Sequence, residues 1–149
     1  FLKNNYRVAT KEITGWWKDT GKPDDLLHAN RLLIDELNIP ETPPIEGVVS
    51  AGAVRIGSGC VFGPEVLLHG PVLIGDNVTL ERATIGPYVA IGSGTVIRGA
   101  TLADSILFDN VEISAQLNLV QSIIGEKVRV RQASAKQRLI VGDQATIEF

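Results

Sequence analysis

An aliphatic residue followed by glycine recurs through the last two thirds of this chain at a nearly constant interval, and this repeat constrains the fold more than any other feature. The pairs are Ile56-Gly57, Ile74-Gly75, Ile91-Gly92, a degenerate Phe108-Asp109, Ile124-Gly125 and Val141-Gly142. Their successive intervals are 18, 17, 17, 16 and 17 residues. A fixed period of this length is typical of a solenoid, in which each repeat forms one turn of a coil.

A second periodicity divides each turn into three hexapeptides. In the five clear repeats a further aliphatic or aromatic residue follows six positions later, at Phe62, Leu80, Ile97, Val130 and Ile147. Each hexapeptide can supply one short strand and one corner, where glycine permits the sharp backbone geometry. We therefore predict a mainly β fold, in which residues 48–149 form a parallel β-helix of about five coils. An antiparallel sandwich is the alternative, but it does not explain why the pairs recur in phase.

Residues 23–38 show a different pattern, with apolar residues at helical spacing. Pro23 suits the first helical position, and Asp24 and Asp25 suit the positive end of the helix dipole. Prolines then exclude a continued helix. The predicted organisation is a segment ending in a helix at residues 1–38, a linker at 39–47 and the β-helix domain at 48–149. We expect the helix and the linker to cover the first coil.

The composition excludes several classes of function. The chain has 149 residues, with 14 lysines and arginines against 17 aspartates and glutamates, and the net charge of −3 argues against nucleic-acid binding. No apolar run approaches the roughly 20 residues of a membrane span. The single cysteine excludes an internal disulfide and favours a reducing, cytoplasmic location. The chain contains no methionine and starts at Phe1, so we expect it to be a piece of a longer protein.

A short run before the predicted helix carries the first candidate site. It reads Gly15-Trp16-Trp17-Lys18-Asp19-Thr20-Gly21, directly ahead of Lys22 and Pro23. A carboxylate on a tight turn beside a helix N-terminus can bind a divalent cation and place amides near a phosphate. The alternative is an ordinary Asp-Thr-Gly turn with both tryptophans in the core. Because one carboxylate does not define a metal site, the spacing alone favours the ordinary turn.

The same run resembles a known family. The segment from Thr14 to Leu27, followed by Ala29-Asn30-Arg31-Leu32-Leu33, resembles the end of the catalytic domain of sugar-1-phosphate nucleotidyltransferases. The resemblance is strongest to the long form of the glucose-1-phosphate thymidylyltransferases, which carries a C-terminal hexapeptide β-helix. Blocks such as Gly70-Pro71-Val72-Leu73-Ile74-Gly75 and Ile85-Gly86-Pro87-Tyr88 are also similar. The resemblance implies that residues 1–38 end a catalytic domain. It also implies that the β-helix is left-handed, a known exception to right-handed crossovers.

The family joins a nucleoside triphosphate to a sugar 1-phosphate and releases pyrophosphate, while Mg²⁺ neutralises charge on the reacting phosphates. A thymidylyltransferase of this kind converts dTTP and glucose 1-phosphate into dTDP-glucose and pyrophosphate. The resemblance implies that Asp19 is a catalytic residue, one of two metal-binding carboxylates, and that Trp17 lies beside the sugar pocket. The second carboxylate and the Gly-rich nucleotide loop have no counterpart in this sequence. We therefore expect the full-length enzyme to bind Mg²⁺ and both substrates, and this fragment alone to be inactive.

His69, in Leu67-Leu68-His69-Gly70, supports an alternative function. Many hexapeptide β-helices are acyltransferases, in which a histidine between coils deprotonates the acceptor of an acyl-CoA. A polar side chain on an outer face explains an isolated histidine more simply. Another interpretation is a structural and regulatory module without chemistry. The chain ends at Ile147-Glu148-Phe149, and because an exposed parallel edge invites pairing, we predict a homo-oligomer formed through the β-helix.

Overall fold

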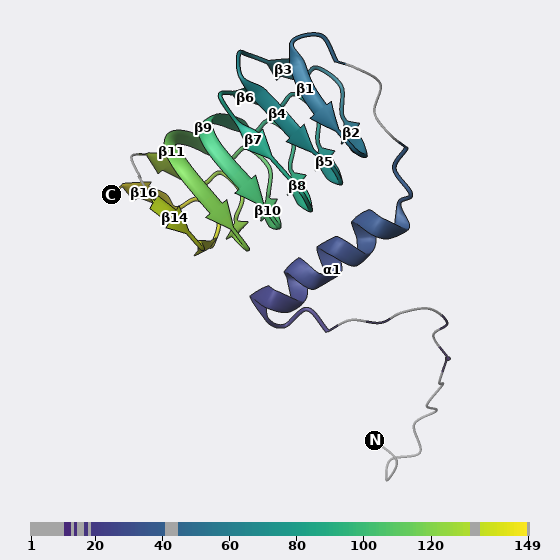
Figure 1. Cartoon of the computed structure of the whole chain (residues 1–149). Helices are drawn as coiled ribbons and strands as arrows, with labels where there is room; N and C mark the ends of the chain where they lie inside the picture. The colour runs from purple at the N-terminus through teal and green to yellow at the C-terminus, as the bar shows by residue number, and fades with distance from the viewer. Residues whose placement is uncertain are drawn as a thin grey trace.

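The described part of the chain forms a coil of short parallel strands with one helix beside it (Figure 1). The structure is a computed structural model and describes residues 11, 12, 14, 17, 19–40, 45–131 and 135–148. The helix is α1 (Pro23–Glu36). The first face of the coil contains β2 (Val54–Ile56), β5 (Val72–Ile74), β8 (Val89–Ile91), β10 (Ser105–Leu107), β12 (Ile123–Ile124) and β15 (Ile140–Val141).

The strands of the second and third faces join at one corner of the coil. The second face contains β3 (Val61–Phe62), β6 (Thr79–Glu81), the first half of β9 (Val96–Ala103), the first half of β11 (Glu112–Val120), β13 (Arg129–Arg131) and β16 (Thr146–Glu148). The third face contains β1 (Val48–Ala51), β4 (Val66–His69), β7 (Thr84–Ile85), the second halves of β9 and β11, and β14 (Ala135–Gln137). The strands β9 and β11 each continue from the second face onto the third.

Each strand pairs with its equivalent in the next turn, and these pairs are parallel. The architecture is therefore the predicted parallel β-solenoid, and it fits a left-handed β-helix. The first face holds six strands in the order β15-β12-β10-β8-β5-β2, so the coil has six turns. The prediction of about five coils was one too low. It counted the five intervals between the pairs, whereas the six pairs each belong to one turn.

The core consists of aliphatic ladders along the axis of the coil. On the third face, Leu68, Ile85, Leu102 and Leu119 occupy equivalent positions in four successive turns, and each side chain is fully buried. Burying one such side chain contributes about 1.5–3 kcal/mol to the free energy of folding, relative to leaving it exposed. Because the strand alternation points every second side chain inward, the hexapeptide pattern fills the interior.

Serine replaces an aliphatic residue in one ladder of the first face. Ser105 pairs with Val89 of the preceding turn and is fully buried, as is Ser122. The Ser105 Oγ donates to the carbonyl of Ala103 at 2.7 Å and accepts the backbone N–H of Ser122 at 3.1 Å. These bonds satisfy the buried hydroxyl, which would otherwise cost about 1–3 kcal/mol.

The fourth repeat differs by one residue from the sequence-based alignment. Leu107 pairs with Ile91 of the preceding turn and with Ile124 of the next. The fourth pair is therefore Leu107-Phe108 rather than Phe108-Asp109, and Phe108 stands where the clear repeats have glycine. Its side chain points outward and is 48% exposed. The prediction was wrong because it matched the aromatic residue to the inward isoleucines.

Helix α1 lies along the side of the coil rather than over its first turn, so the prediction of a cap over that turn was wrong. Asp24 at its start contacts Arg138, just before the last turn's β15. Asn30, near its middle, donates to the carbonyl of Tyr88 in the third turn at 3.4 Å. The helix therefore runs from the last turns back toward the first, as Figure 1 shows. It ends at Glu36, two residues earlier than predicted.

Burial explains why the helix docks on the side of the coil. Leu27 and Ile34 of α1 are 5% and 2% exposed, although they lie outside the core of the coil. Ile123 is also buried outside that core, while the outward Ile140 is 47% exposed. The helix contacts β10, next to β12. The apolar stripe of α1 thus covers part of an apolar outer face, which accounts for the helical spacing in the sequence.

Candidate functional site

Asp19 lies on an exposed turn immediately before α1. Its Oδ1 accepts the backbone N–H of Gly21 at 3.0 Å. Lys22 is the N-cap residue and Pro23 begins the helix. This hydrogen bond is that of an Asx turn, in which a carboxylate fixes the backbone two residues later. The turn therefore holds the predicted carboxylate in a defined position at the entrance to the helix.

Trp17 is 74% exposed, whereas Trp16 lies outside the described residues. Within the described residues Trp17 is therefore not part of the core. An exposed indole beside Asp19 leaves a flat apolar surface available for another part of the protein or for a ligand.

No cluster of three or more His, Cys, Asp or Glu side chains suited to a metal ion occurs among the described residues. Asp19 offers one hard oxygen ligand of the kind Mg²⁺ prefers, since this ion is commonly held by one or two carboxylates and substrate phosphates. Asp19 could be one ligand of a site shared with residues outside the described part of the chain. The described residues do not form a complete site.

His69 ends β4 and is exposed on the outer surface. Its main chain pairs with Ala51 of the preceding turn. The groove and the recess described below are lined by other residues. The structure thus places His69 on an outer face, as expected for a histidine without a catalytic role.

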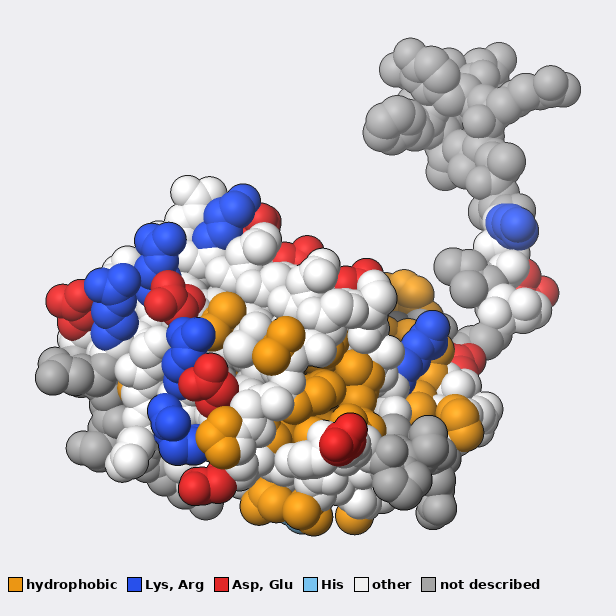
Figure 2. Space-filling model, turned by 90° about the horizontal axis from the view of Figure 1, so that it is seen from above, with side chains coloured by type: hydrophobic (Ala, Val, Ile, Leu, Met, Phe, Trp, Pro, Cys, Tyr) orange, Lys and Arg blue, Asp and Glu red, His pale blue; other side chains and the backbone are white. Residues whose placement is uncertain are grey.

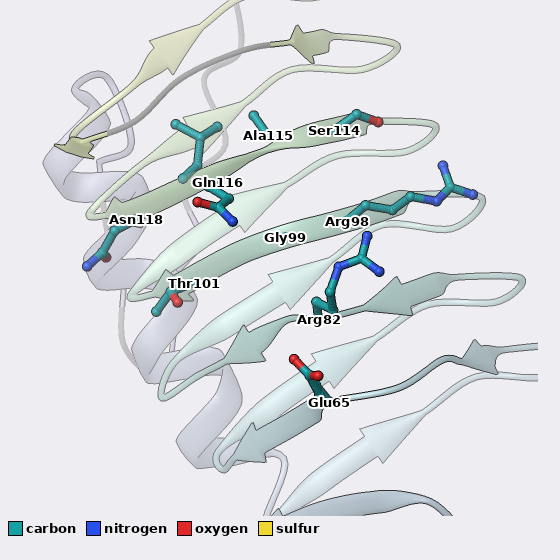
Figure 3. A pocket seen from close by; sticks show the side chains of 10 residues that line it. Glu65, Arg82, Arg98, Gly99, Thr101, Ser114, Ala115, Gln116 and Asn118 are labelled. Carbon is teal, nitrogen blue, oxygen red and sulfur yellow. The ribbon is translucent and has the colours of Figure 1, made fainter.

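A groove of about 920 Å³ crosses the corner between the second and third faces (Figure 3). Its lining is Glu65, Arg82, Arg98, Gly99, Thr101, Ser114, Ala115, Gln116, Leu117 and Asn118. The register between β9 and β11 shifts here, between Ser114 and Leu117. The extra residue in β11 is a β-bulge, which bends the strand and opens the corner.

The charges in this groove largely compensate one another. Figure 3 shows Arg82 and Arg98 on successive turns, with Glu65 on the turn before. The Arg98 Nε lies 3.3 Å from Glu81 Oε2. Two cations face two carboxylates, so the groove has no strong preference for an anion. No sequence pattern predicted this groove, because the bulge is visible only in the strand pairing.

A second recess, of about 550 Å³, lies where the end of α1 meets the first face. Its lining includes Leu37, Leu73, Ala90, Leu107 and Phe108. Leu37 and Phe108 are about half exposed. The recess is open, and polar residues such as Arg55, Asp76 and Asp109 line it as well.

A salt bridge fixes α1 on the coil, and sequence reasoning missed it. The Arg31 Nε donates to Asp104 Oδ1 at 2.6 Å, and Arg31 Nη2 donates to Asp104 Oδ2. The Arg31 guanidinium also lies 5.7 Å from the centre of the Tyr88 ring. The hydrogen bond to Asp104 raises the pKa of Arg31. Because 73 residues separate the partners, the sequence holds no local signal for this pair.

Ion pairs also form rows on the second face. Arg129 lies 3.3 Å from Glu112, one turn below, and Lys127 lies 2.6 Å from Glu126, which raises the pKa of the lysine. In Figure 2 the charged side chains gather on one side of the molecule, and hydrophobic side chains gather near the middle. Charges of both signs alternate there, as on the solvated outside of a solenoid.

Most of the coil matches a known protein family. Residues 68–148, which cover the second to sixth turns, match the family described as GMPPB C-terminal domain. The chain belongs to this family. The match excludes most of the first turn of the coil, as well as α1 and the Asp19 turn.

Curated relatives extend the likeness over nearly the whole chain. A glucose-1-phosphate thymidylyltransferase of Streptomyces antibioticus is 31% identical over 99% of this chain and 42% of its own length. A glucose-1-phosphate thymidylyltransferase of Streptomyces griseus is 30% identical over 95% of the chain and 41% of its own length. The low-salt glycan biosynthesis nucleotidyltransferase Agl11 of Haloferax volcanii is 25% identical over 99% of this chain and 43% of its own length. The chain thus spans about two fifths of the length of these relatives.

None of the helices in the described residues is long and apolar enough to cross a membrane.

Proposed function

We propose that this chain belongs to a sugar-1-phosphate nucleotidyltransferase, most specifically a glucose-1-phosphate thymidylyltransferase. The reaction would join dTTP and glucose 1-phosphate to form dTDP-glucose and pyrophosphate. The observation that carries the proposal is the likeness to such an enzyme over 99% of the chain, which includes the Asp19 turn and α1 as well as the coil. A coil shared for architecture alone would not require the turn and the helix to match as well.

In this proposal Asp19 is a metal ligand and Trp17 borders the sugar. Mg²⁺ would supply charge neutralisation at the phosphates. The contribution of this chain is to hold the Asp19 carboxylate in an Asx turn, with Gly21 N–H on Oδ1 at 3.0 Å, and to present the exposed Trp17 beside it. Phosphate recognition and the second carboxylate would come from residues outside this sequence. The fragment alone would therefore be inactive.

The coil would serve as an oligomerisation and regulatory module, and the enzyme would act in the cytoplasm as a homo-oligomer. Its support is that, within the described part of the chain, β16 pairs on one side only, with β13. Such edges favour coverage by another chain.

Acyl transfer from an acyl-CoA with His69 as base is not favoured. The histidine is exposed at the end of β4 and contributes to none of the cavities described above. A general base must lie within hydrogen-bond reach of the acceptor and next to its binding site. The relatives reported above are nucleotidyltransferases by name.

The test is Asp19→Asn in the full-length protein. This change keeps the size of the side chain and an acceptor for Gly21 N–H, but it removes the negative charge. We expect turnover with dTTP and glucose 1-phosphate to fall by roughly 100-fold or more, with the melting temperature unchanged. Asp25→Asn, six residues away, makes the same change in charge and should retain turnover. Normal turnover in Asp19→Asn would rule out the metal-ligand role.

A further inference from the structure

We propose that Asp104 and Arg31 are positioning residues for the reaction, because they anchor α1 and thereby set the position of the Asp19 turn relative to the coil. The inference rests on the proposed function and deepens it. It assigns to the coil a role in catalysis beyond assembly.

The anchor is a two-point contact of defined geometry. Both Arg31 nitrogens that contact Asp104 lie in the plane of the guanidinium, so the pair fixes orientation as well as distance. The Asp104 side chain is only 12% exposed, while that of Arg31 is 46% exposed. Asp104 has a φ of +49°, and its backbone N–H donates to the carbonyl of Pro87 at 2.8 Å. The coil therefore holds the carboxylate rigidly at its corner.

Further contacts fix the helix along its length. Tyr88, one turn before Asp104, lies under the Arg31 guanidinium, and its phenol hydrogen-bonds to Asp35 near the end of α1. At the other end, Asp24 contacts Arg138. The helix is thus held at its start, middle and end, and it can neither slide nor rotate without breaking these contacts.

The connection from the anchor to Asp19 is short. The helix begins at Pro23, four residues after Asp19, and the bond from Gly21 N–H to Asp19 Oδ1 fixes the intervening turn. A 14-residue helix transmits a rigid-body shift along its whole length. Loss of the anchor would therefore let the Asp19 carboxylate move relative to the coil, and a displacement of about 1 Å at a reacting site can cost two orders of magnitude in rate.

The two-point anchor predicts that replacing Arg31 by lysine lowers activity. A lysine ammonium is a point charge that forms one of the two contacts, whereas the guanidinium fork forms both. Arg31→Lys keeps the charge and most of the side-chain volume. It therefore tests the orientation supplied by the second contact.

The experiment uses the full-length protein and compares Asp104→Asn and Arg31→Lys with the unaltered enzyme. We expect kcat to fall about tenfold in each variant, and the Mg²⁺ concentration for half-maximal rate to rise several-fold, with little change in the KM for dTTP. Arg129→Gln removes an ion pair from the outer surface of the coil, where Arg129 contacts Glu112. It is the matched control and should leave all three quantities unchanged.

The possible outcomes separate this inference from the proposed function. If Asp19→Asn abolishes turnover while Asp104→Asn and Arg31→Lys keep normal kcat and Mg²⁺ dependence, the positioning role is wrong and the proposed function stands. If the full-length enzyme has no nucleotidyltransferase activity, the proposed function fails, and the inference fails with it. If Asp104→Asn does not fold, Arg31→Lys decides, because the partly exposed arginine tolerates substitution more readily. A loss of melting temperature in Arg31→Lys without a change in Mg²⁺ dependence would show a merely structural contact.

Discussion

The carboxylate of Asp76 accepts two hydrogen bonds from Ser58 of the preceding turn, one from its backbone N–H at 2.6 Å and one from its hydroxyl at 3.0 Å. The same corner repeats the contact in other turns, where Asp109 accepts from Ser93 at 2.7 Å and Asp143 accepts from Glu126 at 2.8 Å. An ideal Cβ at Gly57 would lie 2.4 Å from the Asp76 oxygen. Gly57, Gly92 and Gly125 thus make room for a carboxylate of the next turn.

Asp76→Ala should lower the free energy of unfolding by about 1 kcal/mol, because the corner loses an acceptor on an exposed surface. Asp76→Asn keeps an acceptor and should lose less. Thermal or urea unfolding of the purified chain measures both. A loss in Asp76→Asn equal to that in Asp76→Ala would mean that charge, rather than the hydrogen bonds, stabilises the corner.

Among the described glycines, Gly86 is the one where an added Cβ would come closest to the neighbouring turn. A Cβ there would lie 1.8 Å from the carbonyl oxygen of His69, and the residue has a φ of +109°. Gly86→Ala should therefore destabilise the coil by about 3 kcal/mol or more. Gly142 belongs to the last Ile/Val-Gly pair, and a Cβ there meets nothing within 4 Å. Gly142→Ala is the matched control and should change stability by less than about 0.5 kcal/mol. Equal losses in the two variants would contradict the packing argument.

The ionisation of Tyr88 should report the docking of α1. The hydrogen bond from its phenol to the Asp35 carboxylate raises the pKa of Tyr88, while the nearby Arg31 lowers it by a smaller amount. Because the folded pKa exceeds the unfolded value of about 10, this contact stabilises docking at pH values below 10 and is lost as pH rises through the folded pKa.

Alkaline absorbance titration in a Tyr6→Phe background measures that pKa directly, since Tyr6 is the other tyrosine. In Asp35→Asn the pKa of Tyr88 should fall toward its ordinary value. Glu36→Gln removes the neighbouring carboxylate and serves as the control. A titration of Tyr88 unchanged by Asp35→Asn would show that the helix does not dock as described.

Sequence patterns predicted the coil and the helix well, because both patterns are local. The pairs from Ile56-Gly57 to Val141-Gly142 repeat the same inward and corner positions in each turn. The helix follows from Pro23 and the apolar spacing after it. The prediction for the fourth repeat was wrong because Phe108 is hydrophobic and was assigned to the inward aliphatic position. In the structure Phe108 occupies the glycine position and points outward.

In the candidate site, too, the sequence predicted the local feature but not the one that depends on strand pairing. The Asp19 turn was visible in the sequence because an Asx turn depends on residues two positions apart. The groove at Arg82 and Arg98 was not visible, because it depends on a register shift between strands.

By itself, the sequence determined that this chain is a coil of hexapeptide turns with a helix before it, since the period and the helix signals need only neighbouring residues. The tertiary structure alone decided where that helix lies. Its position depends on contacts such as Arg31 with Asp104, which are 73 residues apart. A repeat pattern cannot predict such contacts, because each joins one residue of the helix to one particular corner of the coil. The link between the Asp19 turn and the β-helix therefore appears only once the chain is folded.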